Sequence, residues 1–249
     1  MVSEKRHSII LNLVNSKGVI TLSEIMNETN SSESTIRRDL TFLEEKGALK
    51  RIHGGAKTIS SPSEELTYSE KSSKNLQAKS DIAKLASLEV NNGDSIFLDA
   101  GTTTIEIIKY LKDKNIFVVT NGLKHIDELI DNNINCYLLG GKIKFTTKAI
   151  IGGDALKCIN KFRFDKCFLG SNGIHVSMGC TTPDTEEAII KEAAIKNSKK
   201  SYILCDDSKF GEVSLVKFGD IQDVTIITNN IENISTYKNL TEVKVVEKS

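Results

Sequence analysis

One stretch decides the fold of the N-terminal part of this chain: Ser32-Glu33-Ser34-Thr35-Ile36-Arg37-Arg38-Asp39-Leu40-Thr41-Phe42-Leu43-Glu44-Glu45-Lys46-Gly47. Ser32 is a favourable N-cap residue and Gly47 is a typical C-terminal stop, so the stretch predicts one short helix. At 100° per residue, three apolar side chains share one stripe: Ile36, Leu40 and Leu43. The stretch therefore predicts a helix that is buried on one side only.

The opposite side of this predicted helix carries hydroxyl and guanidinium groups: Ser34, Thr35, Arg37, Arg38 and Thr41. Such groups donate hydrogen bonds to phosphate oxygens and to base edges, as a recognition helix does in the major groove of DNA. A solvated amphipathic helix is the alternative when this stretch is taken alone.

The segments before the stretch favour the DNA-binding alternative. Residues 5–16 have apolar side chains at helical spacing, and Thr21 is placed to cap a second short helix. Three short helices, the last of them basic on its outer side, follow the order of a helix-turn-helix.

The segment after the stretch adds a predicted wing. Residues 48–59 read as two short extended runs around Gly54-Gly55, which suits a tight hairpin turn. This hairpin is basic, and its Arg51, His53 and Lys57 would contact the DNA backbone or minor groove. We therefore predict a winged helix-turn-helix DNA-binding domain over residues 1–59.

The motifs of this domain resemble those of the DeoR family of bacterial transcriptional regulators. The resemblance rests on Arg6-x3-Ile10, on Ser34-Thr35-Ile36-Arg37-Arg38-Asp39-Leu40, and on Arg51-x-His53-Gly54-Gly55-Ala56. It implies a transcriptional regulator, most often a repressor, that binds operator DNA through a winged helix-turn-helix.

Residues 60–75 are rich in serine and predict a linker, after which the sequence changes character. From residue 76 to residue 249, helical segments alternate with short apolar runs, a pattern that predicts an α/β domain with a mostly parallel sheet flanked by helices. The first strand is expected over 95–99 and is followed by a helix over 104–112.

Small and hydroxyl residues gather where these predicted strands end, and ligands of such sheets bind at that edge. They are Asp99, Gly101, Thr102, Thr103 and Thr104 after the first strand, Thr120 and Asn121 after the second, Gly141 after the third, and Gly170, Asn172 and Gly173 after a later one. Because residues 101–104 precede a predicted helix, their backbone N–H groups and hydroxyls would form a phosphate seat.

Two lysines are candidates to complete the anion site, Lys191 on a helix and Lys209 in Asp206-Asp207-Ser208-Lys209-Phe210. By composition alone each reads as a solvated charge, and the following resemblance is what implies a place in the site. The strand-end motifs also resemble the effector domain of the DeoR family. That resemblance implies a domain similar to sugar-phosphate isomerases, which senses a phosphorylated sugar as effector and needs no cofactor.

The alternative function is an active sugar-phosphate isomerase or deaminase with a DNA-binding appendage. Aldose–ketose isomerisation needs a carboxylate base, for which Asp99, Asp165 and Glu187 are candidates. The Asp-Gly-Ala-Asp-Glu run of ribose-phosphate isomerases is missing, so we expect a sensor and not an enzyme.

The composition is consistent with a regulator that works inside the cell. The 33 basic and 33 acidic residues balance, and the five cysteines form no Cys-x-x-Cys pair, so they are expected to be reduced thiols without a metal. No apolar run approaches the length of a membrane span. We expect a cytoplasmic protein that forms a homo-oligomer, a dimer or tetramer, because one recognition helix reads only one half-site.

Overall fold

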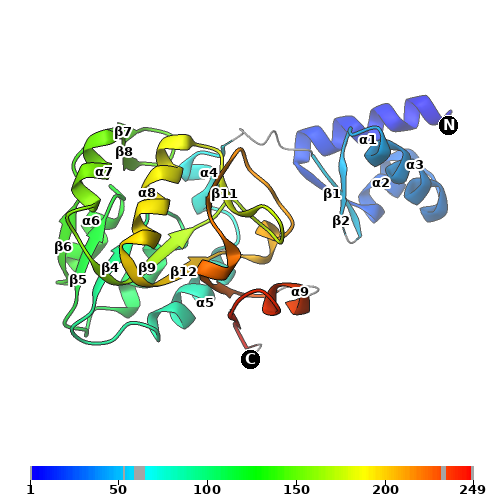
Figure 1. The fold of residues 1–249 in the computed structure, drawn as a ribbon. Coiled ribbons are helices and arrows are strands. Elements are labelled where there is room, and N and C mark those ends of the chain that lie inside the picture. Colours follow the sequence, from blue (N-terminus) through cyan, green and yellow to red (C-terminus); the bar gives the residue numbers. More distant parts are fainter. Residues whose placement is uncertain (1, 53, 59–64, 231–233, 248–249) are drawn as a thin grey trace. The chain divides into compact units, whose positions relative to one another are not determined.

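The computed structural model describes residues 2–52, 54–58, 65–230 and 234–247, which form two compact units. The first unit comprises Met1–Ser61 and the second comprises Pro62–Ser249. Each unit is described by itself below (Figure 1).

The first unit has the predicted three helices and a three-stranded antiparallel sheet. The helices are α1 (Ser3–Lys17), α2 (Leu22–Thr29) and α3 (Glu33–Glu45), and the strands are β1 (Val19–Thr21), β2 (Lys50–Ile52) and β3 (Gly55–Lys57). The strand order is β1-β3-β2, so β2 and β3 are the predicted wing hairpin. Strand β1 was not predicted, because three residues between two helices have no periodicity of their own.

Local chemistry sets the ends of these helices. Thr21 forms a capping box with Glu24 at the start of α2. Gly47 has a φ of +65° and its N–H bonds to the carbonyl of Glu44, which ends the helix as predicted. Ser32 is the N-cap residue of α3, but its hydroxyl bonds to the hydroxyls of Ser34 and Thr35 and not to a backbone N–H. The predicted capping bond of Ser32 is therefore absent.

The core of the first unit contains the predicted stripe of α3. Ile36, Leu40 and Leu43 pack against buried residues of the other elements: Ile10, Val14, Ile20, Ile25, Leu49 and Ala56. Burial of this stripe orients the opposite side of α3 toward solvent.

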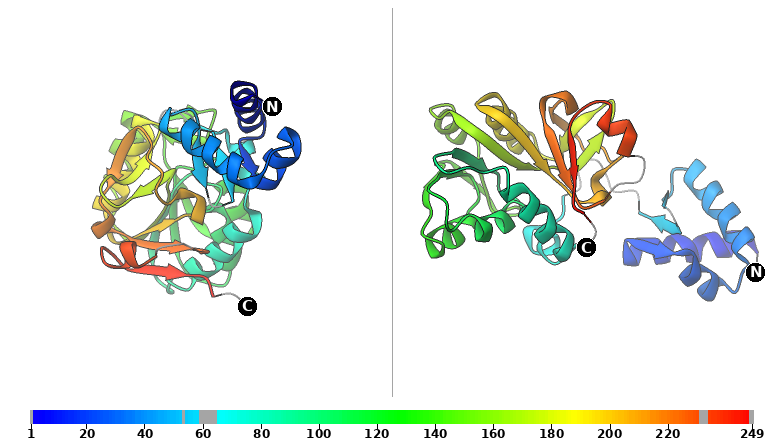
Figure 2. Two further views of the ribbon diagram at one scale, coloured as in Figure 1. Left: turned by 90° about the vertical axis from the view of Figure 1, so that its right-hand side faces the viewer. Right: turned by 90° about the horizontal axis from the view of Figure 1, so that it is seen from below.

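The second unit is built on a seven-stranded sheet in which every neighbouring pair is parallel (Figures 1 and 2). The strands are β4 (Ser95–Leu98), β5 (Phe117–Thr120), β6 (Asn135–Leu138), β9 (Phe164–Gly170), β12 (Ser198–Leu204), β14 (Thr225–Thr228) and β15 (Val243–Val245). Their order is β15-β14-β12-β9-β4-β5-β6. The predicted parallel α/β fold is confirmed.

Alternate residues of each strand face opposite sides of the sheet, and each side has its own core. On β4, Ile96 and Leu98 pack with α5 (Leu76–Ser87), η1 (Ile105–Tyr110) and α6 (His125–Asp131). Phe97 packs on the other face, where α7 (Gly153–Ile159) and α8 (Thr185–Lys196) contribute the apolar side chains.

Smaller elements complete the second unit. They are the hairpin of β7 (Lys142–Lys144) and β8 (Ala149–Ile151), a sheet of β10 (Gly173–His175), β11 (Gly179–Thr182) and β13 (Val216–Gly219), and the helices α4 (Tyr68–Ser72), η2 (Asp207–Lys209), η3 (Ile221–Asp223) and α9 (Ile234–Lys238).

Two predictions about the second unit are wrong. The helix expected over 104–112 is the six-residue 3₁₀ helix η1, whose short length gives it little of the dipole that the predicted phosphate seat required. The linker expected over 60–75 extends too far, because residues 65–75 bond to the second unit: the Tyr68 N–H donates to the Thr146 carbonyl at 2.7 Å, and Lys144 pairs with Glu65.

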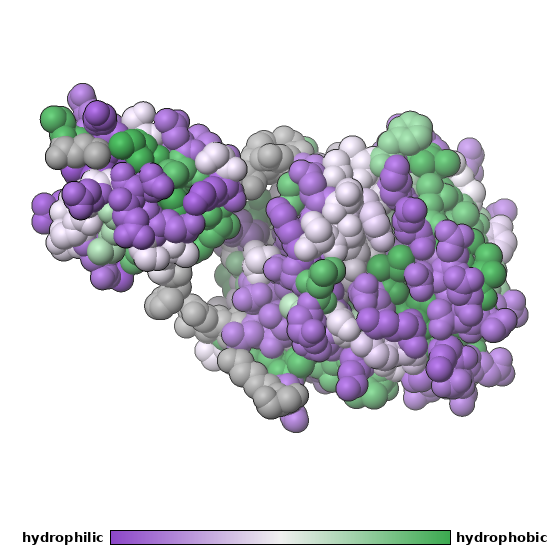
Figure 3. Space-filling view, turned by 180° about the vertical axis from the view of Figure 1, so that it is seen from behind, coloured by the Kyte–Doolittle hydropathy of each residue, from purple (hydrophilic) through white to green (hydrophobic). Residues whose placement is uncertain are grey.

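No described helix is long and apolar enough to cross a membrane. On the face drawn in Figure 3, hydrophilic side chains surround smaller hydrophobic areas.

Candidate functional site

The outer side of α3 presents the predicted DNA-binding groups to solvent. Ser34, Arg37 and Arg38 are exposed, and Thr35 and Thr41 are half-buried. Arg37 pairs with Glu33 one turn earlier at 2.7 Å, whereas the side chain of Arg38 bonds to no residue that the structure describes. The guanidinium of Arg38 is therefore the one on this helix that is available to a base edge without breaking an ion pair.

The wing is joined to the recognition helix by Arg51. The Arg51 guanidinium donates to the hydroxyl of Thr41 at 2.7 Å, and the Arg51 backbone N–H donates to the carboxylate of Glu44 at 2.8 Å. The sequence analysis assigned Arg51 to the wing alone. In the structure it lies against α3, so the wing and the helix form one basic surface. Lys57 is half-buried on β3, and His53 lies outside the described residues.

A buried carboxylate fixes α3 to α1. Asp39 accepts hydrogen bonds from the Arg6 guanidinium and lies 2.9 Å from the His7 ring nitrogen. Burial raises the pKa of Asp39, but its hydrogen bonds to Arg6 and His7 outweigh burial and lower that pKa overall. The ring of His7 also stacks on Phe42 at 5.1 Å. Asp39 was assigned no role from the sequence. Its position next to the apolar stripe of the predicted helix was the signal that it could be buried.

At the carboxyl edge of the sheet, Asp99 and Lys191 meet. The Lys191 ammonium donates to the Asp99 carboxylate and to the Gly170 carbonyl, the latter at 3.0 Å, and the Gly170 N–H donates to Asp99 at 3.1 Å. The structure thus brings together three predicted residues from β4, β9 and α8. However, it commits Lys191 to a carboxylate, so Lys191 is not the free anion donor that was expected.

Several predicted ligand residues form hydrogen bonds with backbone groups at this edge of the sheet. Thr104 donates to the Asp99 carbonyl at 2.6 Å, and Thr120 donates to the Leu98 carbonyl at 2.7 Å. Asn121 accepts from the Ala100 N–H at 2.8 Å. These three polar groups are therefore used in holding the strand-end loops together, contrary to the expectation that they face a ligand.

A buried histidine that the sequence analysis missed supports the same loop. The Nε2 atom of His125 lies 3.2 Å from the Thr104 hydroxyl, while Nδ1 has no partner among the described residues. Burial lowers the pKa of His125 to about 4, against a smaller opposing effect of Asp99. A Cβ at Gly122 would lie 2.3 Å from Nδ1, so only glycine fits beside this ring.

Close packing or a hydrogen bond within the protein explains four further predicted residues. A Cβ at Gly141 would lie 2.7 Å from the Ile151 carbonyl, and a Cβ at Gly173 would lie 2.3 Å from the Glu212 carbonyl. The Asn172 amide oxygen accepts from the Thr182 hydroxyl at 3.3 Å. Gly101 lies close to the Thr104 hydroxyl in the same way. Packing accounts for these positions without a ligand.

Two predicted hydroxyls remain open. The Thr102 and Thr103 side chains make no hydrogen bond within the described residues, and Thr102 is half-buried beside the Asp99 loop. They are the hydroxyls of this loop that a bound ligand can engage without breaking an existing bond.

Basic residues gather near the end of β12, next to these loops. Burial lowers the pKa of Lys79 most. The negative charges of Asp206 and Glu106 oppose this effect, and the positive charges of Lys209 and Lys71 add to it. The Lys79 ammonium donates to the Lys71 carbonyl. Lys209 was predicted, but Lys79 of α5 and Lys71 of α4 were not, and Lys71 lies in the segment that was taken for a linker. We call Lys71, Lys79 and Lys209 the lysine cluster.

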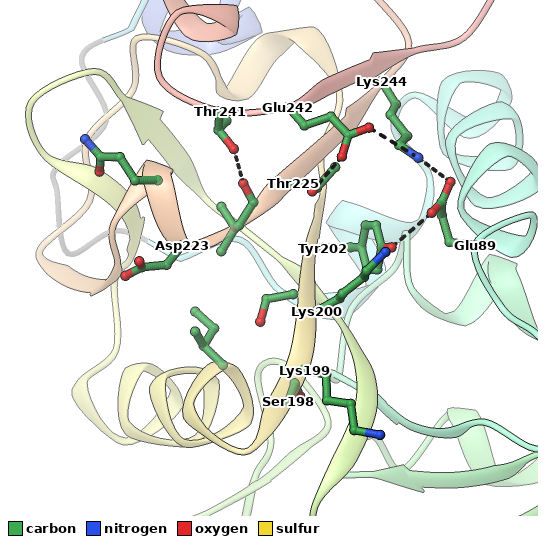
Figure 4. Close-up of a pocket in the computed structure, with 14 residues that line it drawn as sticks. Glu89, Ser198, Lys199, Lys200, Tyr202, Asp223, Thr225, Thr241, Glu242 and Lys244 are labelled. Carbon is green, nitrogen blue, oxygen red and sulfur yellow. Dashed lines mark hydrogen bonds and ion pairs between the residues drawn. The ribbon is translucent and has the colours of Figure 1, made fainter.

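A hollow lies at the amino edge of the sheet, opposite the edge that carries the residues described above (Figure 4). It has a volume of about 540 Å³ and is lined by residues of β12 and β14 together with Glu89, Glu242 and Lys244. Lys244 pairs with both glutamates, and Tyr202 donates to Glu89 at 3.0 Å. The charges of Glu89, Glu242 and Lys244 in this hollow therefore compensate one another.

Comparison with known families agrees with this geometry. Residues 6–62 match the DeoR-like helix-turn-helix domain, and residues 74–230 match the DeoR C terminal sensor domain. Together these matches cover nearly all of both units.

Curated relatives match over the full length. The chain is 50% identical over 250 residues to the uncharacterized HTH-type transcriptional regulator FruR of Bacillus subtilis, covering 99% of this chain and 100% of the relative. It is 35% identical to the HTH-type transcriptional regulator GlpR of Haloferax volcanii, covering 91% and 89%. It is 32% identical to the lactose phosphotransferase system repressor of Staphylococcus aureus, covering 95% and 98%.

Solved structures resemble part of the chain at low sequence identity. Ribose 5-phosphate isomerase A of Methanocaldococcus jannaschii matches with a TM-score of 0.42 and 17% identity, covering 55% of each chain. The eIF2B beta subunit of Chaetomium thermophilum matches with a TM-score of 0.47 and 15% identity, covering 66% of this chain and 54% of the other. With its basic recognition helix and wing, its parallel-sheet second unit, and both family matches, this chain belongs to the DeoR family of helix-turn-helix transcriptional regulators.

Proposed function

We propose that this regulator is a repressor of a sugar-metabolism operon and that a phosphorylated sugar, bound at the carboxyl edge of the sheet, modulates its binding to operator DNA. The observation that carries the proposal is the lysine cluster, where the buried Lys79 ammonium donates to the Lys71 carbonyl and is also close enough to Lys209 to feel its charge. A bound dianion, such as a phosphate monoester, would compensate the positive charge of the buried Lys79 ammonium, whose pKa is lowered chiefly by burial.

The hydroxyl-rich loop beside the lysine cluster supports a sugar as the rest of the ligand. Thr102 and Thr103 have free donors and acceptors for sugar hydroxyls, and the Asp99–Lys191 pair holds the loop that carries them. A relative named as a lactose phosphotransferase system repressor agrees with a role in sugar metabolism.

The same geometry argues against the enzyme alternative. Isomerisation needs a carboxylate that can accept a proton from substrate, whereas the Asp99 carboxylate accepts hydrogen bonds from Lys191 and from the Gly170 N–H. We infer a sensor that binds its ligand without converting it, and a protein that works in the cytoplasm.

On the DNA side, the proposal assigns base contacts to Arg38 and the outer hydroxyls of α3, and backbone contacts to the wing. A recognition helix of this length reads one half-site, so the regulator would bind its operator as a dimer or tetramer. The proposed division is a DNA-binding domain over residues 1–59 and a sensor over residues 76–249, with the intervening segment considered below.

The test is a titration of the full chain on DNA taken from upstream of its own gene, followed by fluorescence anisotropy. Fructose 1-phosphate, fructose 6-phosphate, glucose 6-phosphate, inorganic phosphate and the free sugars are added separately. One hexose phosphate should change the operator affinity by at least about fivefold, and its free sugar should not. Equal responses to a sugar and its phosphate would contradict the proposal.

A further inference from the structure

The first described residues of the second unit form a strap, residues 65–75, that is tied to the sensor at several points. The Glu65 carboxylate accepts a hydrogen bond from Lys144 of β7, and within the strap it accepts another from Lys71 at 3.0 Å. The backbone N–H of Tyr68 donates to the Thr146 carbonyl at 2.7 Å. The strap is the first described part of the second unit that follows the DNA-binding unit in the sequence.

Lys144 is the cation at the centre of these ties. Besides Glu65, its ammonium lies 3.0 Å from the Asp184 carboxylate and 3.4 Å from the Glu187 carboxylate. Only 14% of the Lys144 side chain is exposed, and only 10% of the side chains of Glu65 and Glu187. One ammonium therefore joins the strap to the first turn of α8 at a site largely shielded from solvent.

The contact between the strap and α8 depends on the positive charge of Lys144. Three carboxylates face one ammonium, and the negative charge of Glu65 raises the pKa of Glu187, which burial raises most of all. Without the ammonium, Glu65 would be repelled by the carboxylates that now share it. Lys144 therefore holds the Glu65 end of the strap against α8, in addition to the Tyr68–Thr146 bond farther along the strap.

The same turn of α8 leads to the proposed effector site. Glu187 precedes Lys191 by one helical turn, and Lys191 pairs with Asp99 at the carboxyl edge of the sheet. A ligand that shifts this end of α8 changes the position of Asp184 and Glu187 relative to Lys144.

We infer that Lys144 is the latch through which the sensor controls the strap, and through the strap the chain that leads to the DNA-binding unit. The inference rests on the proposed function in one respect, since it takes the effector to bind at the carboxyl edge. It adds the route by which that site is coupled to DNA binding.

The test compares three variants of the full chain. Lys144→Met removes the charge, Lys144→Arg keeps it, and Lys142→Met is a matched control two residues earlier on β7, where the side chain is 68% exposed and pairs with Glu186. Melting temperatures check that each variant is folded. Amide hydrogen exchange of Tyr68 reports the docking of the strap without any ligand.

We expect Tyr68 to exchange about tenfold faster in Lys144→Met and at the wild-type rate in the two other variants. If Lys144→Met melts early, Glu65→Gln, which removes the opposite charge from the strap alone, should give the same local increase. Unchanged exchange in both Lys144→Met and Glu65→Gln would overturn the latch.

Coupling is measured as the ratio of operator affinities with and without the hexose phosphates used above. Lys144→Met should reduce that ratio by at least about threefold, while Lys142→Met leaves it unchanged. A wild-type response that persists in full in Lys144→Met would overturn the inference. No response of the wild type to any phosphate would instead refute the proposed effector, and the exchange measurement would still decide the latch.

Discussion

Lys191 and Asp99 form an ion pair in the interior of the second unit, with 7% and 4% of their side chains exposed. Removing one partner of a buried pair leaves the other charge without compensation, which is far more costly than losing an exposed pair. This pair therefore holds the loops of the carboxyl edge in place before any ligand arrives.

Lys191→Met should destabilise the second unit by about 3–5 kcal/mol, since it leaves the Asp99 carboxylate buried alone. Urea unfolding followed by circular dichroism measures the loss. Lys217→Met is the matched control: its pair with Asp220 is largely exposed, and its removal should cost less than about 1 kcal/mol. Similar losses of unfolding free energy in both variants would show that the buried pair contributes no more to stability than the exposed pair.

Arg38→Ala should weaken binding to the specific operator by about 1–3 kcal/mol and reduce discrimination against random DNA, because this guanidinium is exposed and has no bonding partner among the described residues. Anisotropy titrations on both kinds of DNA measure the effect. Lys17→Ala, an exposed lysine at the end of α1, serves as the control and should change neither affinity by more than about twofold. A loss that is equal on both DNAs would place Arg38 on the phosphate backbone.

Thr41 and Arg51 should act as one unit in DNA binding, because the Thr41 hydroxyl accepts a hydrogen bond from the Arg51 guanidinium. Thr41→Val and Arg51→Ala, measured singly and together on the same operator, form a double-mutant cycle. We expect a coupling free energy of about 0.5 kcal/mol or more. Strict additivity would mean that the wing and α3 contact the DNA independently.

Lys79→Met should abolish the response to a hexose phosphate while leaving DNA affinity in its absence nearly unchanged. The reason is that Lys79 is the buried member of the lysine cluster and supplies charge to a phosphate. The control is Lys84→Met, an exposed lysine on the same helix. Titration of an operator complex distinguishes them, and a normal response in Lys79→Met would place the phosphate elsewhere.

The stability of the second unit should fall as the pH is lowered from 6.5 to 4. His125 has a pKa of about 4 in the folded protein, below its ordinary value, so the unfolded chain takes up the proton first as the pH falls. The contribution of His125 is fully lost below pH 4 and amounts to about 3 kcal/mol. His125→Gln keeps a donor toward Thr104 but does not titrate, so its unfolding free energy should depend less on pH over this range. An identical pH profile would refute this role.

The predictions that succeeded from sequence rest on local patterns. The stripe of Ile36, Leu40 and Leu43 is visible within one helix, and the apolar runs of the parallel strands are visible within a few residues. Gly47 ends its helix through its own backbone conformation. Such features need no knowledge of distant neighbours.

The predictions that failed depend on partners far along the chain. Serines made residues 60–75 look like a linker, but Glu65 meets Lys144, which lies 79 positions away. Lys191 looked like a free cation, but its partner Asp99 is 92 positions away. Lys79 joined the site only once α5 was placed beside the end of β12.

The short wing also fixes the point at which the chain leaves the DNA-binding unit. A Cβ at Gly55 would lie only 2.0 Å from the Ile20 carbonyl, and the Thr58 N–H donates to the Gly18 carbonyl at 2.9 Å. Strand β3, which leads out of this unit, is thus held against β1, the strand between α1 and α2. We therefore expect a displacement of Thr58 to carry β1 and the two flanking helices with it.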